Sequence, residues 1–483
     1  MNKIQTKKMT NFRWVICAML FFATTVNYLD RQALSLTWKD FIAPEFHWSN
    51  TDYGNIAAAF AIMYAIANFF SGRIIDWLGT KKGYLWAIGI WSTGACLHAL
   101  CGWATEHVVG VHDAAQLVSA TGDVAVTVSM VSVYFFLAAR VVLAAGESGN
   151  FPAAVKVTAE YFPKKDRAFA TSIFNAGATI GALIAPLCIP TLASYFKRIG
   201  VGNGWEMAFI AIGVLGFIWM GLWLFVYEPL ETNKHVNDAE SEYILQDSKC
   251  EAEEADSNHK MSISECLRLK QTWAILLGKF FTDGVWWFFL FWTPAYISDV
   301  YGYTSDTFMA QMLIFVLYAI TMLSLYGGKL PTIFINRTGK DPYTCRLRAM
   351  FIFALFPLLG LLAQPLGRYS CWITIIIIGI IGAAHQSWSA NLFSVGSDLF
   401  PKGAVATITG LNGMAGGLSS FLINFLSGRI IDHYDSSQSV FLGFQGKEGA
   451  YMIIFCYCSV AYLVGWIVMK SLVPRYKPVT EKS

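Results

Sequence analysis

The chain alternates long apolar runs with short polar segments, and many of the apolar runs are long enough to cross a membrane. Residues 207–227, MAFIAIGVLGFIWMGLWLFVY, are one example. About 20 apolar residues in a helix span the roughly 30 Å of hydrocarbon in a bilayer. The runs predict an all-α polytopic membrane protein with twelve transmembrane helices, at 13–37, 52–77, 83–105, 124–158, 167–195, 206–227, 272–298, 308–335, 347–366, 371–397, 404–430 and 449–471.

Two polar segments interrupt this pattern. Residues 107–123 carry acidic side chains and no Lys or Arg, and residues 228–270 include the run CEAEEADSNHK. The longer segment leaves six helices on each side. We therefore predict an N-terminal six-helix bundle at 1–227, a cytoplasmic linker at 228–270 and a C-terminal six-helix bundle at 271–483, related by pseudo-symmetry.

An internal repeat supports the two halves. YFPKKDRAFATSIFNAGATIG (161–181) and LFPKGAVATITGLNGMAGG (399–417) both run from FPK through small residues to an Asn and a GxxxG. Glycines at this spacing allow close helix packing in membranes. Generic small-residue packing would explain the glycines, but the shared FPK and Asn favour a duplicated sequence, which is common in transporters.

The hexapeptide SGRIID also occurs twice, at 71–76 and 427–432. The first copy closes the second predicted helix and the second copy closes the eleventh. Because these helix ends fall on opposite surfaces, the copies are not symmetry mates. We expect the repetition of the hexapeptide itself to be a coincidence.

Composition and charge agree with a membrane location. The chain is 55% hydrophobic and 14% charged, whereas soluble domains are about 25% charged. Of its 35 Lys and Arg, 26 lie in the N-terminal segment, the even-to-odd loops and the C-terminal tail, and six lie in or near the opposite loops. Basic loops stay on the cytoplasmic side. We expect a multi-pass protein of the cell inner membrane with both termini cytoplasmic.

Several charged residues fall inside predicted helices, where a charge costs about 2.5–3.5 kcal/mol on insertion scales. They form three groups: Asp30 with Arg31, Arg140 with Glu147, and Lys279 with Asp283. The last two pairs, at seven and four residues apart, each share one helix face. Purely structural ion pairs are the plainer reading, most of all for Lys279 and Asp283. The favoured reading is a cavity in which a substrate carboxylate and an acidic side chain compete for one arginine.

Polar and aromatic residues complete the expected lining. Tyr28 lies on the face of Arg31, Tyr64 is in the middle of the second helix, and the tenth helix carries HQSWSANLF with Gln386 and Asn391. Amides and aromatic faces suit a polyhydroxylated ligand. His385 suits a proton relay or, more often, a structural hydrogen bond. Trp286 and Trp287 suit the interfacial belt, packing or substrate stacking.

No sequence feature indicates catalysis. The ten cysteines lack metal-ligand spacing, and neither a nucleophile–base constellation nor a soluble signalling domain is present. We therefore expect no enzyme, no metal and no cofactor. The expected partners are a small organic anion, protons and the lipid bilayer, with no nucleic acid, and the protein is expected to function as a monomer.

GRIIDWLGTKKG, residues 72–83, resembles the loop motif G-x-x-x-D-x-x-G-x-[KR]-[KR] of the major facilitator superfamily. The motif positions imply a role in gating, and twelve helices in two halves fit the same family. The residues that fill the motif are Gly72, Asp76, Gly79, Lys81 and Lys82.

Further segments resemble the anion:cation symporter branch of this superfamily, particularly bacterial hexuronate transporters. These segments are NYLDR, RVVLAAGE, EYFPKKDRA, GKFFTDGVWWFFLFW and HQSWSANLF…SDLFPKGAVA. The resemblance implies proton-driven uptake of sugar acids by alternating access. It implies Arg31 as carboxylate ligand, Asp30 and Glu147 as proton carriers with Arg140 between them in function, and a substrate site lined by Tyr28, Tyr64, Lys279 and Asn412.

The substrate stays open within this resemblance. A hexuronate such as glucuronate or galacturonate is the leading expectation, and the added cation Lys279 is consistent with it, since aldonate transporters tend to carry Gln there. Another organic anion is the alternative: an aldonate such as galactonate, a sialic acid or an aromatic acid. A membrane sensor or enzyme that does not transport is a remote third.

Overall fold

The computed structural model of the protein describes residues 9–111, 113–246, 261–327 and 329–479. Within these ranges, ten helices are long and apolar enough to cross a membrane. The structured part is almost entirely helical, apart from a hairpin of β1 (Val440–Phe441) and β2 (Phe444–Gln445). The predicted all-α membrane fold is confirmed.

The first half of the chain forms one group of helices: α1 (Arg13–Thr37), the π-helix η1 (Trp38–Ile42), α2 (Ala43–Phe46), α3 (Asn50–Leu78), α4 (Thr80–Val109), α5 (Ala114–Val118), α6 (Gly122–Glu147), α7 (Asn150–Tyr161), α8 (Lys164–Arg198) and α9 (Trp205–Val226). The short helices α10 (Asp238–Leu245) and α12 (Ile263–Leu267) follow in the segment that connects the halves.

The second half contains α13 (Lys270–Tyr301), α14 (Phe308–Thr321), α15 (Ser324–Gly327), α16 (Lys329–Thr338), α17 (Pro342–Leu355), the 3-10 helix η2 (Phe356–Leu359), α18 (Gly360–Gly367), α19 (Cys371–Leu399), α20 (Lys402–Ser437) and α21 (Lys447–Leu472).

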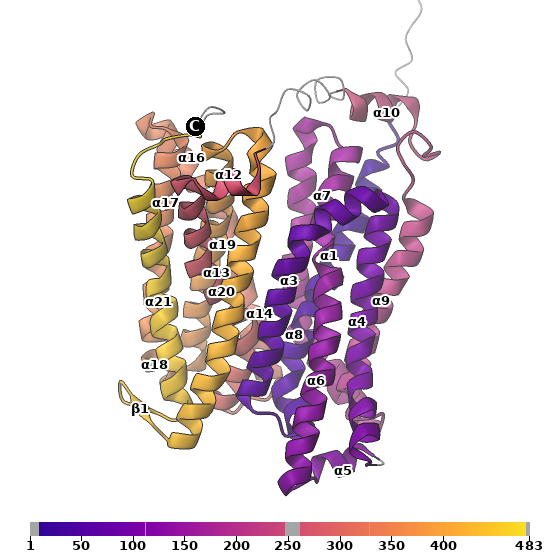
Figure 1. The fold of residues 1–483 in the computed structure, drawn as a ribbon, viewed down its shortest axis with the longest axis vertical. Helices are drawn as coiled ribbons and strands as arrows, with labels where there is room; N and C mark the ends of the chain where they lie inside the picture. Colours follow the sequence, from indigo (N-terminus) through magenta and orange to yellow (C-terminus); the bar gives the residue numbers. More distant parts are fainter. Residues whose placement is uncertain (1–8, 112, 247–260, 328, 480–483) are drawn as a thin grey trace, which may run out of the picture.

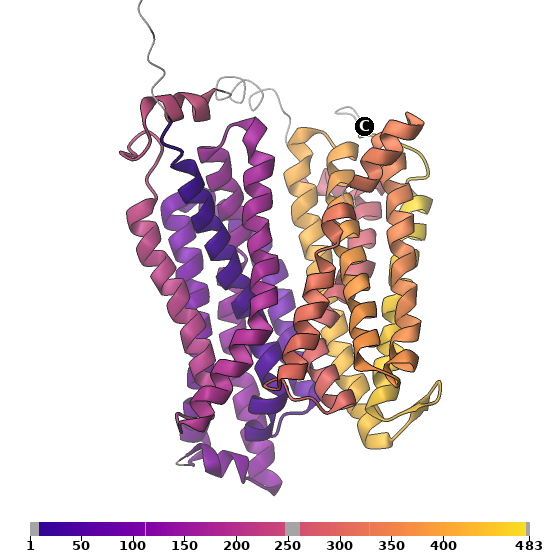
Figure 2. The same cartoon turned by 180° about the vertical axis from the view of Figure 1, so that it is seen from behind.

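The two halves stand side by side as an N-bundle and a C-bundle (Figure 1; Figure 2 gives the view from behind). The C-terminus, α10 and α16 lie at one end, called here the terminal end. The segment with α5 and the β-hairpin lie at the opposite end, called here the far end. The long helices run between these two ends.

Several helices differ from their predicted spans. The predicted helix 124–158 is divided into α6 and α7 directly after Glu147. Gly146 and Gly149 lie at this break, and a Cβ on Gly146 would collide with the backbone of α4 at Trp91. The close approach to α4 therefore accompanies the interruption.

Two further helices are broken, and one is longer than predicted. The span 308–335 is divided among α14, α15 and α16, and the span 347–366 passes through η2, which contains Pro357. A proline lacks the backbone N–H that an α-helix needs. Helix α20 runs to Ser437, past the predicted end at 430, so the second SGRIID copy lies within the helix.

The connecting segment is attached to the N-bundle by Glu240. Its carboxylate accepts hydrogen bonds from the backbone N–H groups of Phe12 and Arg13 at the start of α1. It also accepts one from Thr10 Oγ1 and pairs with the Arg13 side chain at 2.9 Å. These contacts satisfy N–H groups that have no partner within a helix.

Hydrogen bonds that join the two bundles gather at the far end, where α20 crosses the beginning of α3. Asp432 of α20 accepts from the backbone N–H of Asn50 at 3.1 Å and of Thr51 at 2.6 Å. Its Oδ1 also accepts from Asn50 Nδ2 at 2.8 Å. One turn earlier, Arg429 donates to Asn55 Oδ1 at 2.9 Å. A carboxylate at a helix N-terminus is favourable because it meets free N–H groups and the positive end of the dipole.

Glycines allow the two helices to come this close. A Cβ on Gly54 of α3 would lie 2.6 Å from the carbonyl oxygen of Asn424, and a Cβ on Gly428 of α20 would collide with the backbone of Asn50. We call this contact of Gly428, Arg429 and Asp432 with the start of α3 the far-end latch. All three α20 residues belong to the second SGRIID copy, and the sequence did not predict its contact with α3.

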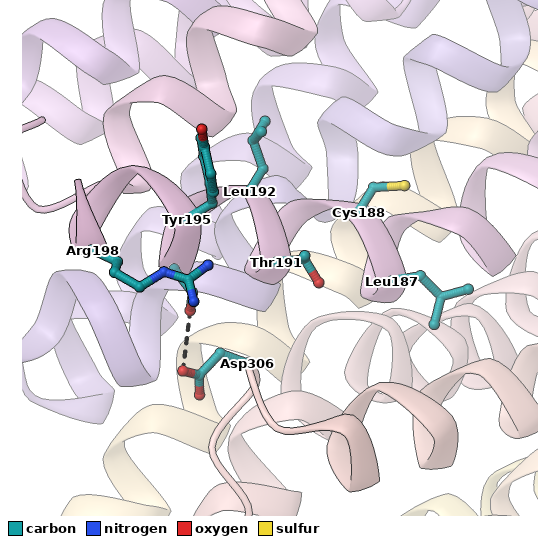
Figure 3. Close-up of a pocket in the computed structure, with 8 residues that line it drawn as sticks. Leu187, Cys188, Thr191, Leu192, Tyr195, Arg198 and Asp306 are labelled. Atoms are coloured by element: carbon teal, nitrogen blue, oxygen red, sulfur yellow. Dashed lines mark hydrogen bonds between the residues drawn. The ribbon is translucent and has the colours of Figure 1, made fainter.

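Other contacts between the bundles surround the latch. Asp40 of η1 accepts from Ser298 Oγ at 2.8 Å and from the N–H of Ser305 at 2.7 Å, and Lys39 pairs with Asp299 at 2.8 Å. A cavity of about 640 Å³ lies beside α8 at the same end. Figure 3 shows Arg198 of α8 beside Asp306, which belongs to the C-bundle and accepts a hydrogen bond from Ser194 at 3.1 Å. The far end is thus closed by polar contacts on both sides of the bundle interface.

The latch predicts that Asp432→Ala opens the far end. Hydrogen bonds to a charged group contribute about 1.5–3 kcal/mol each, and 1.4 kcal/mol is about tenfold in an equilibrium. We expect a cysteine placed at Ser305, which is buried here, to react at least about tenfold faster with an impermeant maleimide, in a background without the native cysteines. Asp435→Ala is the matched control, because Asp435 is one turn further along and pairs within the C-bundle, with Lys447. Equal rates in both variants would contradict the latch.

Candidate functional site

The centre of the N-bundle contains a buried ion pair between α1 and α6. Arg31 donates from Nε at 2.9 Å and from Nη2 at 2.7 Å to the same carboxylate oxygen, Oε2 of Glu147. Both side chains are almost fully removed from solvent. The other carboxylate oxygen, Oε1, has no hydrogen-bond partner among the described residues. Glu147 is therefore held by one cation on one oxygen, and its second oxygen is left for a proton.

Aromatic rings surround the Arg31 guanidinium. Its Cζ lies 4.7 Å from the ring centre of Tyr64, 5.0 Å from Tyr28 and 5.8 Å from Phe60. Trp287 of α13 is at 5.3 Å, so the C-bundle also contributes to this cage. Cations are attracted to the faces of such rings. The sequence placed Tyr28 on the face of Arg31 and Tyr64 in the expected lining, and both rings lie beside the guanidinium. It did not single out Phe60 and left Trp287 undecided.

A second acid and a second arginine lie next to this pair. Asp30 is fully buried, and neither of its carboxylate oxygens has a hydrogen-bond partner among the described residues. Asp30 interacts electrostatically with Arg140, Arg31 and Glu147. Arg140 is also buried, packs on the ring of Phe60 at 5.3 Å, and has Nε and Nη1 without partners in the same described part. The two acids and two arginines thus balance in charge, while several of their polar atoms have no hydrogen-bond partner among the described residues.

The C-bundle supplies the third predicted pair. Lys279 Nζ lies 2.9 Å from Oδ1 of Asp283, one turn along α13. It also donates to Ser389 Oγ of α19 at 3.1 Å and lies 4.9 Å from the ring centre of Phe393. Lys279 is nine-tenths buried, so it stays within the bundle and does not extend to the membrane surface.

The remaining predicted lining residues differ in how close they lie to the charged groups. Gln386 is half-buried and lies three residues before Ser389 on α19, hence on the face that reaches Lys279. Asn412 is buried on α20 with Oδ1 unpartnered among the described residues, one turn before Gly416, which contacts Asp283. Asn391 donates its amide to the backbone of its own helix at Ser387. No contact joins Asn391 to the charged groups in the described part of the chain.

The predicted gating motif lies at the terminal end, between α3 and α4. Asp76 pairs with Lys156 of α7 at 2.7 Å, Gly79 has a positive φ of 79° at the turn, and Lys81 donates to the carbonyl of Leu224 at 3.0 Å. Gly72 has open space around its Cα and Lys82 is exposed. The motif therefore ties the ends of helices within the N-bundle.

Comparison with known proteins agrees with this architecture. The family model of the Major Facilitator Superfamily matches residues 20–424. The chain belongs to the major facilitator superfamily. It is a multi-pass membrane protein and a secondary transporter, not an enzyme.

Several relatives are named as transporters of sugar acids. The hexuronate transporter of Escherichia coli K12 is 29% identical over 430 residues, covering 88% of this chain and 89% of the relative. The galacturonate transporter of Dickeya chrysanthemi is 27% identical over 368 residues, covering 75% and 95%. A probable galactarate/D-glucarate transporter of E. coli K12 is 25% identical over 471 residues, covering 94% and 96%. The predicted kinship with hexuronate transporters is confirmed.

Solved structures share the fold at low sequence identity. A bacterial homologue of the human lysosomal transporter Spinster, in an inward-facing and unoccupied conformation, superposes with a TM-score of 0.67 at 16% identity, covering 97% of this chain and 99% of that one. The xylose transporter XylE of E. coli in an inward-open conformation gives 0.65 at 14% identity, covering 97% of each chain. These likenesses establish the fold alone.

The buried pair predicts an order of stabilities. Glu147→Ala leaves Arg31 as an uncompensated buried cation, at a cost of about 3–5 kcal/mol. Glu147→Gln retains an oxygen that accepts a hydrogen bond from the guanidinium, so this variant should lose less stability. The double variant Arg31→Met with Glu147→Leu removes both charges and should recover most of the loss. Thermal unfolding in detergent measures this order, and a Glu147→Ala variant as stable as the parent would contradict it.

Proposed function

We propose that the protein carries out proton-coupled uptake of a sugar acid, a hexuronate, across the inner membrane by alternating access. The observation that carries this proposal is the buried pair of Arg31 and Glu147, in which Arg31 binds one carboxylate oxygen and the other has no hydrogen-bond partner among the described residues. A carboxylate substrate is the ligand that a planar guanidinium fork fits best.

Coupling follows from competition for Arg31. While Glu147 is ionised, it occupies two N–H donors of the guanidinium. A proton that binds Glu147 removes the negative charge and weakens this pairing, so Arg31 becomes available to the substrate carboxylate. The four charges of the cluster sum to zero when all are ionised, so one added proton leaves a net positive charge that one monoanion neutralises. Proton and substrate therefore stabilise each other in the site.

Asp30 and Arg140 extend the same principle. Asp30 is a buried acid with both oxygens unpartnered among the described residues, so it offers a second place for the proton within the cluster. Arg140 interacts electrostatically with both acids. Its positive charge favours their ionised forms. We assign Asp30 and Glu147 to proton coupling and Arg140 to the site between them.

The rest of the lining suits the body of a sugar acid. Tyr28 and Tyr64 offer rings and hydroxyls next to Arg31, while Gln386 and Asn412 offer amides from the facing bundle. Lys279 places a cation opposite Arg31. The relatives' names, hexuronate and galacturonate transporter, support this substrate class.

A sugar acid with two carboxylates is the second candidate substrate. Lys279 favours it, because Arg31 and Lys279 lie in different bundles and could each bind one end of such a molecule. The 25% identical relative named as a probable galactarate/D-glucarate transporter points the same way. Competition of galactarate and galacturonate for labelled galacturonate uptake ranks the two classes.

Alternating access would use the far-end latch. The basic residues around the terminal end favour a cytoplasmic location for it, which places the latch at the outer surface. With the latch closed, the site would be reached from the cytoplasm, and opening it would expose Arg31 to the outside. At the cytoplasmic surface, the gating contacts would come from the predicted motif of Gly72, Asp76, Gly79, Lys81 and Lys82.

Proteoliposome uptake tests the proposal directly. An inward proton gradient should raise the initial rate and the final accumulation of labelled galacturonate or glucuronate at least about fivefold over equal pH. An uncoupler should abolish the difference. If no sugar acid accumulates under a proton gradient, the proposed function is wrong.

Arg31→Ala should abolish binding and uptake together, because the carboxylate loses its bidentate ligand. Arg31→Lys should bind at least about tenfold more weakly, since an ammonium group cannot make the same paired contact. Binding measured by quenching of tryptophan fluorescence in detergent separates this effect from transport. Normal affinity in Arg31→Ala would remove this residue from the site.

Glu147→Gln should separate exchange from accumulation. Gln cannot gain or lose the proton, so accumulation driven by a proton gradient should fall by about tenfold or more. Exchange of labelled for unlabelled substrate at equal pH needs no net proton movement and should persist. Unchanged accumulation in this variant would place the coupling proton on another acid.

A further inference from the structure

The C-bundle contains a titratable chain that the competition at Arg31 does not use. It consists of Lys279 and Asp283 on α13, His385 on α19 and Tyr462 on α21. All four residues are buried. They lie within a membrane-spanning bundle, where ionisable groups are costly unless they are paired or functional.

The tautomer of His385 follows from its partners. Tyr462 donates its hydroxyl hydrogen to the carbonyl of Thr282 at 3.4 Å, so its oxygen is an acceptor. We assign His385 Nδ1, at 2.8 Å from that oxygen, as the N–H donor. The ring of Trp286 stacks on the imidazole at 5.4 Å with an interplanar angle of 1° and fixes its plane. His385 Nε2 is left with a free lone pair.

This nitrogen lies near the carboxylate of Asp283, the same group that pairs with Lys279. His385 Nε2 lies 4.0 Å from Oδ1 of Asp283. Lys279 Nζ is near the same oxygen at 2.9 Å, yet Oδ1 receives no hydrogen bond of acceptable geometry from any described residue. Two acceptors thus face each other with no hydrogen between them, in a site where a polar atom without a partner is costly.

Asp283 has space for its carboxyl group because the facing helix carries a glycine. A Cβ on Gly416 of α20 would collide with Oδ2 of Asp283 and lie 3.4 Å from Cε of Lys279. Any larger residue would displace the carboxylate from Lys279 and His385. Gly416 therefore keeps the acid in the position where it faces both groups.

We propose that Asp283 and His385 form a second proton site, in the C-bundle, which controls whether Lys279 is available to substrate. A proton binds Oδ1 of Asp283, and the new O–H group donates a hydrogen bond to His385 Nε2. The carboxyl group is then neutral, and Lys279 loses its counter-ion. Lys279 can bind an oxygen of the substrate, and loss of the proton restores the ion pair and releases that oxygen. This inference rests on the proposed function, since it adds a proton to the same transport cycle.

Titratable groups face this site from several neighbouring helices. Lys279 and Asp283 are on α13, His385 on α19, and Tyr462 with Cys458 next to it on α21. Tyr318 of α14 packs against Trp286, and Tyr28 of α1 interacts electrostatically with Asp283. Helix α20 presents Asn412 and Gly416, which do not titrate. Lys279 is the one cation among the described groups named here, so protonation of Asp283 leaves a single positive charge for a substrate oxygen to meet.

The test is the number of protons moved with each substrate molecule. This number is calculated from the membrane voltage at which net flux of labelled galacturonate stops under fixed pH and substrate gradients. Asp283→Asn should lower this number by one relative to the parent, while exchange at equal pH persists. Asp398→Asn is the matched control: this α19 carboxylate is paired with Arg346 at 2.7 Å in the same bundle, and its removal should leave the number unchanged.

His385→Gln gives an independent readout if Asp283→Asn does not fold. Without the imidazole acceptor, protonated Asp283 is less stable, so half-maximal uptake should require a pH at least about half a unit lower than in the parent. An unchanged proton number in Asp283→Asn, or an unchanged pH profile in His385→Gln, would overturn the second proton site. If the parent shows no proton-driven uptake at all, the proposed function itself has failed, which is a distinct outcome.

Discussion

The cost of placing charge in a membrane is the constraint on which this structure depends. Arg31 and Glu147 are buried in the N-bundle, and each is tolerable there because the other is present. A pair of this kind is poor as a source of stability, since apolar residues of similar volume would serve as well or better. It becomes useful when one partner can be neutralised by a proton and the other can bind an anion. The same logic applies to Lys279 and Asp283 in the other bundle.

The helices around the pairs provide a site that both bundles build. Arg31 of α1 contacts Trp287 of α13, and Asp283 lies one turn before Trp287 on the same face of that helix. A substrate between them would contact both bundles at once. Relative movement of the bundles is then coupled to binding, because contacts to both sides are complete only when the bundles are correctly placed. The far-end latch adds polar contacts between the two bundles.

Much of the fold could be predicted from the sequence because apolar length is a strong signal. The first helix matches its predicted span, and most others differ by a few residues at their ends. The interruptions at Glu147 and in the segments 308–338 and 342–367 could not be predicted, since they arise where glycines, prolines and close neighbours meet in space. Asp30, Arg31, Arg140, Glu147 and Lys279 were identifiable because charges stand out in apolar runs. Their partners across helices were not.

The residues missed by sequence reasoning share one property: their roles depend on long-range neighbours. Phe60 and Trp287 are ordinary aromatic residues in an aromatic-rich chain until Arg31 is placed between them. Gly416 is one of many small residues until Asp283 occupies the space above it. The second SGRIID copy has the same sequence as the first, and its position against the start of α3 is what makes it part of the latch.

The central claim is that a substrate carboxylate displaces an acid from Arg31 and that this acid takes up a proton. Proton uptake by the purified protein in weakly buffered detergent solution measures it most directly, as galacturonate is added at a pH where the site is ionised. The account predicts that the protein takes up protons in proportion to the substrate bound, and that Glu147→Gln takes up about one fewer per substrate. Substrate binding without any change in bound protons would contradict it.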